Sequence, residues 1–122
     1  MRRFGIVGVL VLVAIVLATS LCFAATIEGG GRQTRGYPGH NAELYGEVFV
    51  LPRTGTITNV TAEGTDGFWI EKASGELVVS FNTLKQAIGY SLPAGSYRVL
   101  PNLRDYPEKA NRSWVRITVN CP

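Results

Sequence analysis

Nucleophilic catalysis by serine or cysteine usually needs a base beside the nucleophile, and histidine is the usual one. The chain holds a single histidine, His40, in a Gly-rich stretch, and only two cysteines, Cys22 and Cys121. Along the last predicted strand, where side chains alternate between the two faces, Cys121 falls on the same face as the apolar residues. We therefore expect a buried thiol; an interchain disulfide is the alternative. One histidine and one cysteine also fall short of the four ligands of a zinc site. The sequence therefore predicts neither a triad nor a zinc centre.

Carboxylate pairs offer two further chemistries. A glycosidase needs two carboxylates across a cleft, and Glu71 and Glu76 lie on one predicted hairpin, but carboxylates at strand ends are usually solvated. Glu63 and Asp66 in the segment EGTDG offer oxygen ligands for calcium, yet a plain turn explains the same residues. We therefore expect no enzymatic activity, no metal and no cofactor.

Two tryptophans and two arginines are the candidates for binding. Because side chains alternate along a strand, Trp69 points away from the face that holds Phe68 and Ile70, and Trp114 alternates with Val115. Exposed aromatic rings gathered in a patch often mark a binding surface; the alternative is that a loop or short helix covers them. An arginine beside them either stacks on an indole ring or is solvated over its apolar stem. The predicted ligand-binding residues are Trp69, Trp114, Arg98 and Arg116.

The segments that position these residues alternate polar and apolar side chains from Leu44 onward, with turn signals every 8 to 12 residues or so, which is typical of a sandwich or barrel. A Ser74-Gly75 loop would fix the register of one hairpin and would set Phe68 opposite Phe81. That register places Phe68, Ile70, Leu77, Val79 and Phe81 on one inward face. The predicted strands are 46–51, 56–62, 68–73, 76–82, 90–92, 97–99 and 113–121, with a short helix over 82–89 that crosses between sheets.

The N-terminus predicts export. Arg2 and Arg3 precede an apolar run, and small residues follow near Ala24, which is the layout of a signal peptide cleaved after Ala24. An uncleaved membrane anchor over residues 4–25 is the alternative, and a lipoprotein signal at Cys22 is a weaker one. Without Arg2 and Arg3 the 12 basic residues fall to 10 against 9 acidic ones, so the mature charge is +1 rather than +3. A near-neutral chain with scattered charges does not favour nucleic acid as a partner.

These patterns predict an all-β fold: a single antiparallel β-sandwich, jelly-roll-like, with one short helix and preceded by a signal peptide. The predicted organisation is a signal peptide over 1–24, a flexible Gly-rich lead-in over 25–42 and a β-sandwich domain over 43–122.

The segment GYSLPAGSYRV at residues 89–99 predicts a hairpin, with Pro93-Ala94-Gly95 as its turn and a positive φ at Gly95. It resembles the late strands of small secreted bacterial β-sandwich modules of the pre-peptidase C-terminal type, in which an L-x-A-G-x-Y-x-V segment recurs. The resemblance implies a jelly-roll-like, non-catalytic accessory module. The acidic positions that bind calcium in some of those modules are not clearly matched.

We therefore expect a secreted or periplasmic, non-catalytic binding or accessory module at the cell envelope. Its partner is an extracellular glycan or protein that the sequence does not identify, with carbohydrate as one candidate. Membrane contact is expected only through the N-terminal segment, if that segment is not cleaved. The alternative function is a small secreted inhibitor of a hydrolase, which would present the loop 52–56 or 101–112 to an enzyme cleft.

Overall fold

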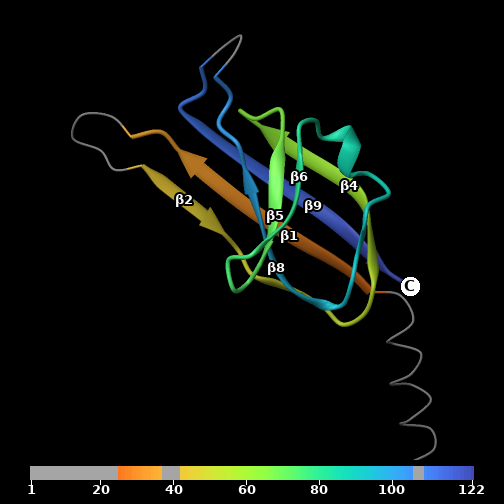
Figure 1. Ribbon diagram of the computed structural model, residues 1–122. Helices are drawn as coiled ribbons and strands as arrows, with labels where there is room; N and C mark the ends of the chain where they lie inside the picture. The colour runs from red at the N-terminus through yellow and green to blue at the C-terminus, as the bar shows by residue number, and fades with distance from the viewer. Residues whose placement is uncertain (1–24, 37–41, 106–108) are drawn as a thin grey trace, which may run out of the picture.

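The computed structural model describes residues 25–36, 42–105 and 109–122, which form antiparallel strands and one 3₁₀ turn (Figure 1). The predicted all-β class is confirmed. The expected signal peptide and His40 lie outside the described residues. The elements are β1 Ala25–Thr34, β2 Glu43–Gly46, β3 Phe49–Leu51, β4 Gly55–Glu63, β5 Phe68–Lys72, β6 Leu77–Phe81, η1 Lys85–Ala87, β7 Ser91–Leu92, β8 Gly95–Pro101 and β9 Arg112–Cys121.

The strands form a five-stranded sheet in the order β2-β1-β9-β4-β7 and a four-stranded sheet in the order β3-β8-β5-β6. In the view of Figure 1, β5, β6 and β8 of the smaller sheet lie in front of β1 and β9 of the larger one. Buried side chains of both sheets make one core, because alternate residues of each strand point inward. On β9, Val115, Ile117 and Val119 are buried, and the free thiol of Cys121 is buried with them, as predicted.

The flexible lead-in predicted over residues 25–42 is wrong for Ala25–Thr34. This segment is the strand β1, which pairs with β9 along its whole length and with β2 near its end. Its glycines permit close approach to the other sheet instead of flexibility. A Cβ atom at Gly29 would lie 2.5 Å from the ring of Phe49, and one at Gly31 would overlap the carbonyl oxygen of Val99 on β8.

The β5–β6 hairpin has the predicted register at Phe68 opposite Phe81 and at Ile70 opposite Val79. The predicted two-residue loop is wrong. The amide of Lys72 donates to the carbonyl of Glu76, and Gly75 has a φ of +98°, so the loop has three residues. A bulge follows in β6, and Leu77 is therefore 61% exposed instead of pointing into the core.

Two segments expected to stay within one sheet in fact change sheets. The predicted strand 46–51 is divided, since Gly46 ends β2 in the larger sheet and Phe49 begins β3 in the smaller one. The predicted 90–99 hairpin is wrong too, because β7 pairs with β4 whereas β8 pairs with β3 and β5. Gly95, the first residue of β8, has the expected positive φ, +157°. The short helix shrinks to one 3₁₀ turn, η1, which passes between sheets as predicted.

Candidate functional site

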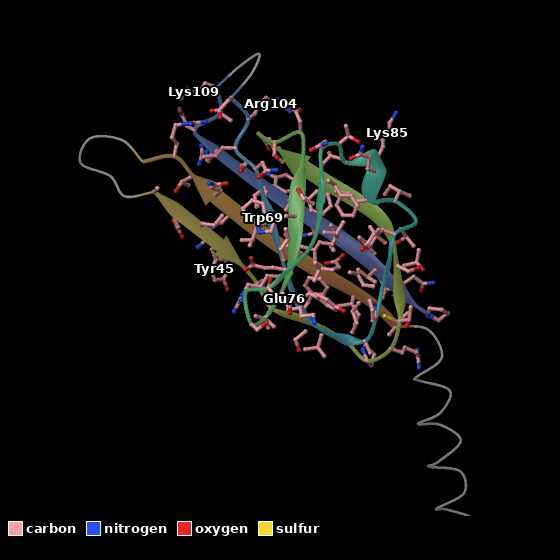
Figure 2. All side chains as sticks on the ribbon, viewed as in Figure 1. Tyr45, Trp69, Glu76, Lys85, Arg104 and Lys109 are labelled. Carbon is pink, nitrogen blue, oxygen red and sulfur yellow. The ribbon has the colours of Figure 1, made fainter. Side chains whose placement is uncertain are left out.

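The four predicted ligand-binding residues lie on two different sheets. Trp114 and Arg116 point outward from β9 in the larger sheet, whereas Trp69 and Arg98 belong to β5 and β8 of the smaller sheet. Figure 2 labels Trp69 on the smaller sheet and Tyr45 on β2. Buried side chains of both sheets share one core, but the two pairs of candidate residues lie on different sheets. The structure therefore brings Trp114 and Arg116 together and separates them from Trp69.

An aromatic row crosses the outward face of the larger sheet beside Trp114. Tyr45 on β2 is in register with Arg32 on β1, Arg32 with Trp114 on β9, and Trp114 with Glu63 on β4. Tyr45 and Trp114 are 51% and 42% exposed. Two strand spacings separate the backbones of Tyr45 and Trp114, which is about 10 Å. Residues close in space here are far apart in sequence.

Polar neighbours hold both rings in place. The indole Nε1 of Trp114 donates a hydrogen bond to Oε2 of Glu63 at 3.2 Å. The guanidinium of Arg32 lies over the ring of Tyr45, 5.0 Å from its centroid, and pairs with Glu43 at 3.1 Å. A ring that is already fixed loses little conformational entropy when a ligand stacks on it. The row is thus a pre-organised stacking surface.

A shallow open hollow of about 230 Å³ lies along this row, and we call it the aromatic hollow. Gly30 lies in its lining, and a Cβ atom there would meet nothing nearer than the carbonyl oxygen of Val115 at 3.8 Å. Gly30 is also not among the described glycines with positive φ. Neither packing nor backbone conformation therefore requires glycine at this position, and its missing side chain leaves the hollow open. The lining residues used below are Gly30, Tyr45, Glu47, Trp114 and Arg116.

One carboxylate and one guanidinium flank Gly30. Arg116 is its cross-strand partner on β9, and the amide of Glu47 donates to the Gly30 carbonyl at 2.9 Å. Within the described part of the chain neither side chain makes an ion pair. A carboxylate accepts hydrogen bonds and a guanidinium donates them. The aromatic hollow thus offers apolar ring faces, an acceptor and a donor in one place.

Arg98 lines a second hollow of about 560 Å³, which we call the edge hollow. Its Nη1 donates to the carbonyl oxygen of Ala73 at 2.7 Å. Among the described residues, the cation–π contact joins Arg32 and Tyr45, and not Arg98 and a tryptophan. Arg98 is also in register with Glu71 on β5. The edge hollow is lined by Leu44, Tyr45, Gly46, Val48, Glu71, Arg98 and Leu100.

The carboxylates considered for catalysis or calcium binding contact protein donors. Glu63 accepts from Trp114, and Oδ1 of Asp66 pairs with Arg104 at 2.9 Å. Glu71 accepts from the indole of Trp69 at 3.3 Å, and Glu76 pairs with Lys72 at 3.4 Å. The described residues contain no group of three or more His, Cys, Asp or Glu that could hold a metal ion.

Sequence reasoning missed Gly30, Arg32, Tyr45 and Glu47. The alternation on β9 revealed Trp114 and Arg116, but residues 25–42 were assigned to a lead-in and Tyr45 lay just before a predicted strand. The available signal for a strand was Ile27, an inward residue of an alternation that continues with Gly29 and Gly31. Glycines have no side chain to display that period, so the pattern stayed hidden.

Comparison of the chain with protein-family models, with curated proteins and with solved structures found no match. Among the described residues, no helix has the length and apolar character needed to cross a membrane. The candidate site is therefore defined by the geometry of the two hollows.

Proposed function

We propose that this protein is a non-catalytic binding module of β-sandwich, jelly-roll-like architecture that acts outside the cytoplasm and holds a glycan in the aromatic hollow. One observation carries the proposal. Two exposed aromatic rings, Tyr45 and Trp114, are fixed by neighbouring side chains beside a hollow that Gly30 leaves open although the fold does not require glycine there.

The chemistry of the hollow favours a sugar. A sugar ring has apolar C–H faces that pack on aromatic rings and hydroxyl groups that both donate and accept hydrogen bonds. Glu47 and Arg116 supply an acceptor and a donor on either side of Gly30. Their charges are opposite, and the third charged residue of the lining, Arg32, is paired with Glu43, so the hollow has no strong preference for a highly charged ligand. A neutral glycan fits this combination of groups.

The expected signal peptide over residues 1–24 supports a location where extracellular glycans are met. Two antiparallel sheets that share one core support the sandwich architecture. Cys121, the one cysteine of the described residues, is compatible with an oxidising compartment, because its buried thiol is inaccessible to a partner.

Trp114→Ala is expected to weaken glycan binding by about tenfold or more, since one stacking face is lost. Trp69→Ala is the matched control, because it removes an indole outside the lining of the aromatic hollow and should leave the affinity for a short oligosaccharide unchanged. Immobilised xylan, β-glucan, mannan and chitin identify the glycan that binds, and calorimetry with its short soluble oligosaccharides gives the affinities. Thermal unfolding of both variants checks that they remain folded.

Equal affinity of Trp114→Ala and the parent for a bound glycan would remove the aromatic hollow as the site. Absence of glycan binding, together with tight binding to a hydrolase that survives Trp114→Ala, would favour the inhibitor function instead. The loops 52–56 and 101–112 would then be the segments to test.

A further inference from the structure

The aromatic hollow and the edge hollow share one thin wall. Along residues 44–48, Leu44, Gly46 and Val48 line the edge hollow, Glu47 lines the aromatic hollow, and Tyr45 lines both. This alternation follows from extended backbone, whose successive side chains point to opposite faces. The wall is therefore a single strand thick, which is about 5 Å.

That wall lies at the edge of the larger sheet. β2 pairs with β1 on one side, and in the described part of the chain no strand pairs with its other side. A ligand can pass over an edge strand from one face to the other without crossing a further strand. The two hollows are thus within reach of one elongated molecule.

The two hollows also repeat the same chemistry. The aromatic hollow combines ring faces with Glu47 and Arg116. The edge hollow combines apolar side chains with Glu71 and Arg98, which face each other in register on β5 and β8. Each hollow therefore combines an apolar surface with a carboxylate and a guanidinium, and the aromatic hollow also contains Arg32, which is paired with Glu43. Two equivalent subsites side by side suit a polymer whose successive units are alike.

The apolar part of the edge hollow is exposed to an unusual degree. Leu44 and Val48 are 52% and 45% exposed and line the edge hollow together with the buried Leu100. Such side chains, gathered in a hollow, form a surface that a ligand can cover. The C–H faces of sugar units match this surface as they match the rings of the aromatic hollow.

We infer that the ligand is a linear, neutral polysaccharide that passes over β2, with some of its sugar units in the aromatic hollow and others in the edge hollow. The inference rests on the proposed function and adds the length and shape of the ligand. Short oligosaccharides fill the aromatic hollow alone, and longer ones gain contacts in the edge hollow. Linking two binding events in one molecule raises affinity without any new site.

The test measures affinity against ligand length. Cello-, xylo-, manno- and chito-oligosaccharides of two to six units are titrated into the protein by calorimetry. For the series that binds, affinity is expected to rise about tenfold or more from the shortest to the longest member. The double variant Leu44→Ala/Val48→Ala should remove this gain and leave the affinity for the shortest bound member unchanged.

Val50→Ala/Leu77→Ala is the matched control, because both residues are exposed apolar side chains outside the lining of the edge hollow. It should keep the full gain with length, and thermal unfolding should show both double variants folded. A flat affinity across the series, or a gain that survives Leu44→Ala/Val48→Ala, would overturn the inference and leave the proposed function intact. Failure of every series to bind would overturn both.

Discussion

Gly31→Ala is expected to lower the free energy of unfolding by about 4 kcal/mol or more, although it adds only one methyl group. The added Cβ atom would overlap the carbonyl oxygen of Val99 and lie 3.3 Å from the Cα of Leu100. These are backbone atoms of β8, which pairs with β5 and cannot rotate away as a flexible side chain would. β1 must then separate from β8 or lose its register with β9. Urea denaturation followed by circular dichroism measures the loss.

Gly30→Ala is the matched control, one residue away on the same strand. Its Cβ atom points into the aromatic hollow, and the nearest atom is 3.8 Å away. Removing a glycine from a strand also restricts the unfolded chain, so stability should be unchanged or higher by up to about 1 kcal/mol. If Gly31→Ala unfolds at the same urea concentration as the parent, β1 does not approach β8 as described.

Gly30→Ile is expected to reduce glycan affinity by about a hundredfold or more while the protein stays folded. The branched side chain suits a strand and would fill the space between Arg116 and Glu47. The effect should exceed that of Trp114→Ala, because the substitution blocks the hollow instead of removing one of its walls. Calorimetry with the glycan bound by the parent measures the affinity.

Thr61→Ile is the control for this substitution. Thr61 is exposed on β4, in register with the other side of Arg116, and does not line the aromatic hollow. It adds a branched apolar side chain to the same face of the same sheet, and the parent's affinity should be retained. Unaltered binding by a folded Gly30→Ile variant would mean that the ligand sits elsewhere.

The predictable parts of the fold are the strands in which apolar and polar side chains alternate visibly along the sequence. β9 alternates buried and exposed residues throughout, and Phe68, Ile70 and Phe81 mark the register of the β5–β6 hairpin. β1 was missed because its central residues are glycines, whose role depends on how near β8 passes. The chain passes from the larger to the smaller sheet at residues 47–48 and 93–94. These crossings were missed because tertiary packing, and not local sequence, decides which sheet a strand joins.

The candidate site was predictable only on its β9 side. Parity alone placed Trp114 and Arg116 outward, and both line the aromatic hollow. Predicting the opposite wall would have required the strand register that places Tyr45 beside Arg32 and Arg32 beside Trp114. This register joins segments that are far apart in sequence. Parity also placed Trp69 outward, but it could not reveal that Trp69 belongs to the other sheet.

The most direct test follows the two indole N–H resonances of the protein by NMR, since the chain has only two tryptophans. Trp69→Phe assigns them by removing one signal. Titration with the shortest oligosaccharide that binds should move the Trp114 resonance, whose N–H is held by Glu63 beside the hollow, and leave the Trp69 resonance in place, because the Trp69 N–H donates to Glu71 in the edge hollow. Saturation of binding with the Trp114 resonance unmoved would contradict the assignment of the aromatic hollow as the binding site.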